Sequence, residues 1–254
     1  MIKLMFSHFL LASIMKFSIV IPCFNEEEYL PRLLNSINNL DWPRSDFEVI
    51  VVDNNSTDKT VEVALQMKVD KVVKESNQGT NWARQRGFLE SHGEIFCAVD
   101  ADCETPKNWL KIINSVLSQK EIVAVSGVCD FPEFSHFDRT FGKFIQKFIY
   151  PIVPKILKFI FRKPAALILG ANFAAKKRVL EELKGFNTKI KFWGEDADIA
   201  MRLVKIGKVV FSPQLEVKTS ARRFKKEGKV NTASKYFLNY FWIYFFNKPF
   251  IEEK

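Results

Sequence analysis

Continuous apolar runs alternate with amphipathic stretches along the first half of the chain, and this alternation restricts the possible folds more than any other feature. Runs rich in β-branched and aromatic residues predict strands, and apolar residues at helical spacing predict helices. The predicted strands are 17–23, 47–52, 71–74 and 94–99. The predicted helices are 30–37, 61–65, 80–90 and 109–117. Strands of this kind, separated by helices, predict an α/β fold with a mostly parallel central sheet and helices on both faces.

Acidic side chains follow several of these strands. Glu26 lies in the turn after the first strand, and Asp53 follows the second. Asp100 and Asp102 come directly after 94–99. Ligands of open α/β sheets bind at the carboxyl ends of the strands, so we expect the acids to share one pocket. Two carboxylates one residue apart suit Mg²⁺ or Mn²⁺, although this spacing also occurs in solvated loops.

A series of short motifs extends from Phe17 to about Arg223. The motifs are Ile19–Glu26, Val51–Asp58, Asn77–Gly79, Ala83–Gly87, Asp100–Asp102, Gly170–Asn172, Gly185–Phe186 and Trp193–Asp196. Each motif alone has modest weight, but their order and spacing together are specific. In this order they resemble the family 2 glycosyltransferases, inverting enzymes with the nucleotide-sugar transferase fold called GT-A.

The resemblance implies a nucleotide pocket. Asp53 would accept a hydrogen bond from the base, and Pro22, Glu26 and Arg84 would line the same pocket. A carboxylate next to a helix N-terminus stays ionised, which suits Asp53 for this task. The guanidinium of Arg84 could bind the diphosphate with paired hydrogen bonds. The alternatives are that Asp53 is an ordinary turn acid and that Arg84 is an exposed charge on a helix.

The resemblance also implies a metal site. Asp102 would bind the metal under the diphosphate, and Asp100 would face the ribose or a metal-bound water. Many relatives supply a late histidine to the metal, whereas the last histidine here is His136. Either the metal has fewer protein ligands, or a late basic segment partly neutralises the diphosphate. In the second case Arg222 and Arg223 contact phosphate; the alternative is a solvated basic loop.

Glu195 and Asp196 are the candidates for the catalytic base. An inverting transfer needs a group that deprotonates the acceptor hydroxyl, and the resemblance places it in this pair. We favour Asp196, with Glu195 as the second candidate. Both are also ordinary first-turn acids of a predicted helix, where the helix dipole favours them. Asp198 is expected to be structural, because it can pair with Arg202 four residues later.

Three positions, an Asn-Asn pair and one glutamine, differ from the family pattern. Asn54 and Asn55 stand where the family often has Asp-Gly. Asparagine tolerates the left-handed conformation, so we expect the turn to form. Gln85 stands where asparagine is common.

Two aromatic segments suggest contact with a membrane. The chain has 25 Phe, and its 38 Lys and Arg exceed its 29 Asp and Glu. Segment 134–163 has phenylalanines on one predicted helical face with basic residues at its flanks, as in helices at a membrane interface. Segment 226–254 is similarly aromatic, and neither reaches a spanning length of about 20 apolar residues. The alternative for each segment is a core or dimer helix.

These features divide the chain into an extension 1–15, a glycosyltransferase domain 16–225 and the aromatic segment 226–254. The extension resembles a signal-peptide core but lacks a cleavage pattern, so we expect an upstream start codon or a surface-seeking extension, with Met15 as a natural start. The four cysteines have no Cys-x-x-Cys spacing and are expected to be reduced and buried. The expected location is the cytoplasm, peripheral at the inner face of the cell membrane.

The predicted function is metal-dependent, inverting transfer of a hexose-type sugar from a UDP- or GDP-sugar to a hydroxyl or lipid-linked acceptor of cell-envelope glycan synthesis. No nucleic acid partner is expected. A non-catalytic membrane-surface binding module is the alternative, and it would bind vesicles without metal-dependent nucleotide binding. A sugar nucleotidyltransferase fits less well, because residues 22–28 are acidic and lack the glycines of a phosphate loop.

Overall fold

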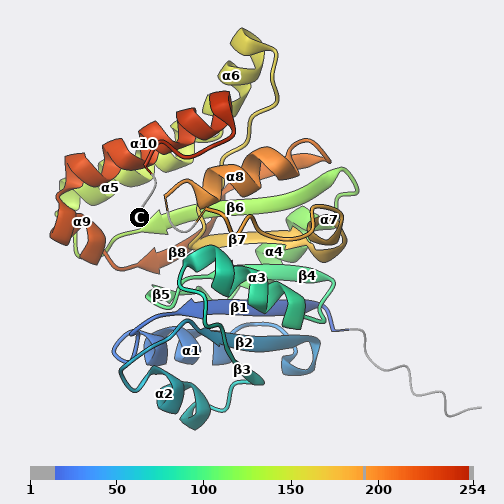
Figure 1. Ribbon diagram of the computed structural model, residues 1–254, viewed down its shortest axis with the longest axis vertical. Coiled ribbons are helices and arrows are strands. Elements are labelled where there is room, and N and C mark those ends of the chain that lie inside the picture. Colours follow the sequence, from blue (N-terminus) through green and yellow to red (C-terminus); the bar gives the residue numbers. More distant parts are fainter. Residues whose placement is uncertain (1–14, 191–192, 252–254) are drawn as a thin grey trace, which may run out of the picture.

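The computed structural model describes residues 15–190 and 193–251. All but the last residue of the predicted extension 1–15 lies outside this part of the chain. One sheet runs through the centre of the described residues, with helices on both faces (Figure 1). The prediction of an α/β fold is confirmed.

The first half of the chain forms the parallel part of the sheet. Its strands are β1 (Phe17–Cys23), β2 (Phe47–Asp53), β3 (Lys71–Lys74) and β4 (Ile95–Val99). Its helices are α1 (Leu30–Asn38), α2 (Thr60–Gln66) and α3 (Thr80–Glu90), with a 3-10 turn η1 (Arg44–Asp46) before β2. The strands lie in the order β3-β2-β1-β4, and all are parallel because a crossover returns the chain to the same edge each time. The predicted bounds differ from these by one residue at most.

The second half of the sheet is mixed. Its strands are β5 (Cys103–Glu104), β6 (Ile122–Asp130), β7 (Asn172–Lys176) and β8 (Lys208–Thr219). The whole sheet has the order β3-β2-β1-β4-β7-β6-β8-β5, and four of its seven pairings are parallel. β7 is antiparallel to β4 with Asn172 opposite Val99, so the loop before β7 reaches the edge where β4 ends.

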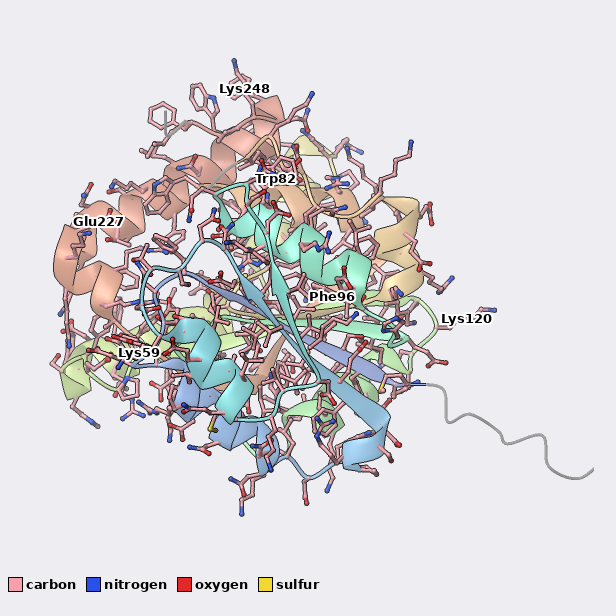
Figure 2. The ribbon with its side chains drawn as sticks, turned by 60° about the horizontal axis from the view of Figure 1, so that its bottom comes forward. Lys59, Trp82, Phe96, Lys120, Glu227 and Lys248 are labelled. Atoms are coloured by element: carbon pink, nitrogen blue, oxygen red, sulfur yellow. The ribbon has the colours of Figure 1, made fainter. Side chains whose placement is uncertain are left out.

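Different helices bury the two faces of the sheet. The helices not yet named are α4 (Trp109–Leu117), α7 (Lys177–Glu182) and α8 (Glu195–Leu203). Helices α1, α2 and α4 pack on one face, and α3, α7 and α8 pack on the other. Neighbouring residues of β1 alternate between the two cores, with Ile19 in the first and Val20 in the second. Phe96 lies at the centre of the second core, whereas Lys59 and Lys120 project from the periphery (Figure 2).

A further group of helices lies at the top of Figure 1. It consists of α5 (His136–Phe144), the π-helical turn η2 (Ile145–Ile149), α6 (Val153–Phe161), α9 (Arg222–Glu227) and α10 (Lys229–Phe246). Leu157 of α6 and Tyr244 of α10 share a small core with Met201 of α8. Within the described ranges, none of the helices combines the length and the apolar character needed to cross a membrane.

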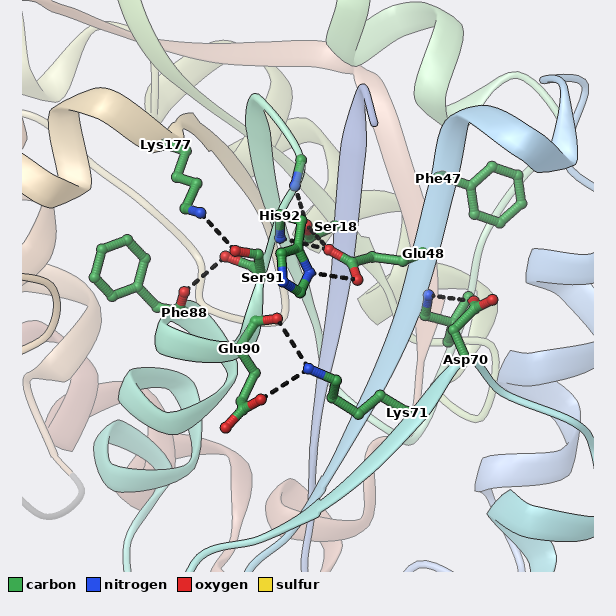
Figure 3. Close-up of polar contacts among 12 residues, drawn as sticks. Ser18, Phe47, Glu48, Asp70, Lys71, Phe88, Glu90, Ser91, His92 and Lys177 are labelled. Atoms are coloured by element: carbon green, nitrogen blue, oxygen red, sulfur yellow. Dashed lines mark hydrogen bonds and ion pairs between the residues drawn. The ribbon is translucent and has the colours of Figure 1, made fainter. Parts of the chain in front are cut away.

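Polar side chains join the amino-terminal ends of the parallel strands (Figure 3). Glu48 accepts hydrogen bonds from Ser18 Oγ at 2.6 Å and from His92 N at 2.6 Å. Its other oxygen lies 3.2 Å from His92 Nδ1. Ser18 Oγ in turn accepts a hydrogen bond from Gly93 N at 2.8 Å. These four residues, the amino-edge cluster, tie β1 and β2 to the loop before β4.

Candidate active site

The acids predicted at the ends of β1 and β2 lie next to each other. In the parallel pairing of β1 with β2, Cys23 is opposite Asp53 and Pro22 is opposite Val52. The turn after β1 therefore lies beside Asp53. Glu26 and Asp53 are both buried, with 7% and 5% of their surfaces exposed. Asp53 Oδ1 accepts a hydrogen bond from Ser56 N at 3.0 Å. One oxygen of Asp53 therefore closes the turn, as the alternative interpretation proposed.

Two asparagines shape the turn after β2. Asn55 has a φ of 67°, which confirms the expected left-handed conformation. The amide nitrogen of Asn54 donates to the carbonyls of Glu75 and Asn77 at 2.9 and 2.7 Å, and its oxygen accepts from Gly79 N at 2.8 Å. This role of Asn54 could not be predicted from the sequence, because its partners lie more than 20 residues away and no periodic pattern marks them. Asn54 joins the end of β2 to the loop that begins α3.

The late basic segment reaches the Asp-x-Asp turn. Antiparallel pairing of β5 with the end of β8 places Thr219 opposite Cys103, and the Thr219 hydroxyl donates to Asp102 Oδ1 at 3.3 Å. Arg222 Nε lies 3.2 Å from Asp102 Oδ2, and both terminal nitrogens of Arg222 bond to the carboxylate of Glu26. Arg222 is therefore part of the acid cluster and not of a solvated loop.

Burial changes the proton affinity of these acids. Burial, together with the negative charge of Asp100, raises the pKa of Asp102 to about 6. Burial also raises the pKa of Glu26, although Arg222 opposes this shift. Two partly desolvated carboxylates thus share Arg222 as a counter-charge, and Arg223 adds a weaker one for Asp102.

Arg84 links the Asp-x-Asp turn to the candidate base. Its Nη2 lies 3.2 Å from Asp100 Oδ1, and its Nη1 lies 3.3 Å from Asp196 Oδ1 and 3.9 Å from Glu195 Oε1. Only 2% of Arg84 is exposed, so the alternative of an exposed helix charge is wrong. Burial and the charge of Asp196 raise the pKa of Glu195 to about 8, and burial also raises the pKa of Asp196. Arg84 opposes both shifts by favouring the ionised carboxylates.

Gly170 allows Arg84 and Asp196 to approach the loop before β7. A Cβ at this position would lie 2.1 Å from Asp196 Oδ1 and 2.4 Å from Arg84 Nη2, so any side chain here would displace one of these two groups. The Gly170 N–H also donates a hydrogen bond to Asp196. Asn172, from the same predicted motif Gly170–Asn172, is fully buried, and its Oδ1 accepts from Trp109 Nε1 at 3.0 Å. Asn172 therefore anchors β7 in the core and lies away from solvent.

Arg223 lies on the other side of the candidate base. Its guanidinium carbon is 5.6 Å from the ring centre of Trp193, and its Nη1 donates to the hydroxyl of Tyr236. The Tyr236 ring packs edge-on against Trp193 with centroids 5.1 Å apart. Burial raises the pKa of Tyr236, and the nearby Glu195 adds to that shift. From the sequence, Tyr236 was expected only as part of the aromatic segment 226–254, and its position at the site was not predicted.

The site thus contains six acids, which we call the carboxyl-edge cluster. They are Glu26, Asp53, Asp100, Asp102, Glu195 and Asp196. Asp198 is separate, because it pairs with Arg202 at 3.3 Å as expected. Among residues 15–190 and 193–251, no group of three His, Cys, Asp or Glu side chains is arranged to hold a metal by itself. The four cysteines are free and buried, as predicted.

Comparison with protein families decides the affiliation of the chain. The model of glycosyl transferase family 2 matches residues 18–184, which include the Asp-x-Asp turn and Gly170. The chain belongs to glycosyl transferase family 2. The resemblance that the ordered motifs predicted is confirmed.

This family 2 chain is shorter than its relatives. It is 34% identical to glycosyltransferase AglE of Haloferax volcanii over 119 residues, which are 45% of this chain and 39% of AglE. It is 27% identical to the probable glycosyltransferase YdaM of Bacillus subtilis over 205 residues, which are 76% of this chain and 47% of YdaM. The chain spans less than half the length of either relative.

Solved structures confirm the GT-A fold of this family 2 chain. Mannosyltransferase PcManGT from Pyrobaculum calidifontis, in complex with GDP-Man and Mn²⁺, aligns with a TM-score of 0.72 and 22% identity, over 89% of this chain and 63% of PcManGT. S. aureus TarS 1-349, in complex with UDP, aligns with a TM-score of 0.64 and 18% identity, over 91% of this chain and 72% of that chain. At these identities the likeness concerns the fold alone.

Proposed function

We propose that this chain is a metal-dependent, inverting glycosyltransferase that moves a sugar from a UDP- or GDP-sugar to a hydroxyl or lipid-linked acceptor. One observation carries the proposal: Arg84 joins the Asp-x-Asp turn to the candidate base Asp196 through contacts of 3.2 and 3.3 Å. A donor bound at Asp53 and Asp102 would then lie beside the group that activates the acceptor. PcManGT and TarS, which share the fold, were solved with GDP-Man and with UDP.

The Asp-x-Asp turn has the chemistry of a divalent-cation site. Burial and then the negative charge of Asp100 raise the pKa of Asp102, which already pairs with the cationic Arg222. Mg²⁺ and Mn²⁺ need only one or two protein carboxylates when waters and phosphate oxygens complete their shell. The residues therefore fit a metal that binds together with a diphosphate. Once bound, the metal would stabilise the charge on the leaving diphosphate.

Asp196 acts as the general base in this proposal. It takes the proton of the acceptor hydroxyl while that oxygen attacks the anomeric carbon, and the bond from this carbon to the diphosphate oxygen breaks. A raised pKa brings Asp196 closer to the working pH, which favours proton transfer. Arg84 keeps Asp196 ionised and fixes its orientation. Arg84 thus positions the acids in this proposal.

The exposed face of α5 and α6 supports an acceptor at a lipid surface. Arg139 of α5 bonds to buried Asp130 at 2.7 and 2.5 Å, and Lys143 bonds to Glu216 at 2.5 Å, so the basic side of α5 faces the protein. The apolar side faces outward instead. Its exposed side chains, with those of η2 and α6, are Phe137, Phe141, Phe144, Phe148, Phe159 and Ile160. We therefore place the enzyme at the cytosolic membrane surface, with 134–163 and 226–254 as its contacts.

Nucleotide binding tests the donor site. We would titrate UDP, GDP and dTDP by calorimetry, with and without Mn²⁺, into the wild type and Asp102→Asn. We expect one nucleotide to bind tightly only with Mn²⁺ and to lose this binding in the variant. No binding of any nucleotide would favour the alternative of a non-catalytic membrane-surface module.

Vesicle binding tests the lipid surface. The double variant Phe137→Ser, Phe141→Ser should bind phosphatidylglycerol vesicles about tenfold or more weakly than the wild type. Each phenylalanine that becomes buried in the lipid contributes roughly 1.5–3 kcal/mol to binding. Metal-dependent nucleotide binding should be unchanged and serves as the folding control. Equal vesicle binding by the two proteins would remove α5 from the membrane contact.

A further inference from the structure

Arg222 bonds to the carboxylate that the proposed metal would need. We propose that Arg222 is an exchangeable internal counter-ion of the donor site, which leaves Asp102 and Glu26 when a metal and a nucleotide diphosphate bind together. The metal alone would then bind weakly, and the diphosphate would provide the new partner of Arg222. This inference rests on the proposed function. It adds that the metal replaces Arg222 as the counter-charge of Asp102 and Glu26.

The contacts of Arg222 match those of a cation held between two acidic turns. Its terminal nitrogens bond to both oxygens of Glu26, one at 2.9 Å, and its Nε lies 3.2 Å from Asp102 Oδ2. Glu26 comes from the turn after β1, and Asp102 comes from the turn after β4. The two carboxylates are only 10% and 12% exposed. Buried carboxylates without a counter-charge are strongly unfavourable, so a positive group is needed here before any ligand arrives.

The side chain of Arg222 can move while its backbone stays in place. Its exposed fraction is 42%, and it rests on the ring of Tyr29 with 4.8 Å between the guanidinium carbon and the ring centre. The backbone just before it is held by Glu133, which accepts hydrogen bonds from Ala221 N at 2.7 Å and from Ser220 Oγ at 3.3 Å. Rotation of the side chain therefore changes its partners without unfolding the turn between β8 and α9.

Arg84 provides the contrast within the same site. Its side chain is 3% exposed, and it lies among three carboxylates beside Gly170, where an added methyl group would displace Arg84 or Asp196. Arg84 is thus fixed, and of the two arginines only Arg222 has room to exchange.

Exchange would couple the binding of metal and nucleotide. A metal that arrives alone must displace Arg222 from Asp102 and leave the guanidinium without its carboxylates. A diphosphate removes this penalty, because its oxygens accept paired hydrogen bonds from a guanidinium as a carboxylate does. The coupling is reciprocal, so Mn²⁺ should strengthen nucleotide binding by the same factor by which nucleotide strengthens Mn²⁺ binding.

The test is Mn²⁺ binding without nucleotide, measured by electron paramagnetic resonance of free Mn²⁺ in the wild type, Arg222→Ala and Arg222→Gln. We expect both variants to bind Mn²⁺ about tenfold more tightly than the wild type, within the range usual for coupled sites. Lys218→Ala is the matched control, because Lys218 lies on the same strand end but pairs with Glu104 at 3.0 Å. It should change Mn²⁺ affinity by about twofold or less, as expected for a charge that does not contact Asp102.

Two outcomes would overturn the inference. One is unchanged Mn²⁺ affinity in both folded Arg222 variants. The other is a gain that persists when Asp102→Asn is added, since the metal would then bind elsewhere. Circular dichroism and thermal unfolding of each variant establish that it is folded. If the wild type binds no nucleotide, the proposed function fails, but the comparison without nucleotide still decides the role of Arg222.

Discussion

Buried acids lie at both edges of the parallel strands, and their pKa shifts have opposite signs. At the amino edge, burial favours a higher pKa of Glu48, but hydrogen bonds from Ser18 and His92 outweigh it and lower the pKa below the usual value. At the carboxyl edge, burial prevails over the counter-charges. The pKa of Asp102 rises to about 6 and that of Glu195 to about 8.

The difference lies in the partners of the acids. Two neutral donors, the hydroxyl of Ser18 and the backbone N–H of His92, each lie 2.6 Å from the carboxylate of Glu48. The acids of the carboxyl-edge cluster face one another and share Arg84 and Arg222. A satisfied acid stabilises a fold, whereas acids with perturbed pKa values in one cluster indicate a functional site. We therefore assign the amino-edge cluster a role in stability, whereas the proposed function assigns the chemistry to the carboxyl-edge cluster.

Loss of the candidate base should give the largest effect. Asp196→Asn removes the group that takes the acceptor proton, so we expect sugar transfer to fall about 10²–10⁴-fold, with nucleotide affinity nearly unchanged. Release of sugar from the donor measures the rate. Asp198→Asn is the matched control in the same helical turn, and it should retain transfer because Asp198 pairs with Arg202. Undiminished turnover in Asp196→Asn would exclude Asp196 from the mechanism.

The amino-edge cluster should respond in stability and not in activity. Glu48→Ala leaves Ser18 Oγ and His92 N without their acceptor, which should lower the free energy of unfolding by about 2–3 kcal/mol. Urea unfolding measures this change. Glu94→Ala, which removes an exposed ion pair with Lys16 at the same edge, should cost about 0.5 kcal/mol or less. Equal losses in the two variants would contradict the special role of Glu48.

The sequence was sufficient to predict the carboxyl-edge acids but not their counter-ions. Parallel strands end at one edge, so Asp53 and Asp102 could be placed together from the strand pattern alone. Arg222 is 196 residues from Glu26, and their contact depends on the short pairing of β5 with β8. No local period encodes that pairing. Tyr236 was missed for the same reason, since α10 is placed by tertiary packing.

Helix α5 shows a second limit of the sequence pattern. The spacing of Phe137 and Phe141 correctly indicated an amphipathic helix, yet a pattern defines two faces without showing which one packs on the protein. Buried Asp130 decides this, because it attracts the basic face through Arg139. The motif Gly170–Asn172 likewise did not show that Asn172 is buried in the core.

The smallest expected effect concerns the pH dependence of stability. The usual pKa of a glutamate is 4.5, and that of Glu195 in the fold is about 8, so the folded protein binds the extra proton between these values. Stability should therefore decline as pH rises from about 5 to 8. Glu195→Gln lacks this titration. The free energy of unfolding of the variant, relative to that of the wild type, should therefore be roughly 1–2 kcal/mol higher at pH 8 than at pH 5.

Glu48→Gln supplies the opposite sign. The pKa of Glu48 is lowered in the fold, so its stabilising contribution is present above the usual value and is lost as pH falls through the folded value. Glu48→Gln should match the stability of the wild type only below the lowered pKa of Glu48. Glu195→Gln should already match it at pH 5 and below, where Glu195 is protonated. Urea unfolding of both variants over this range checks the two signs. If the two variants changed in parallel with pH, the contrast between the edges would be wrong, and Glu195 would be an ordinary first-turn acid.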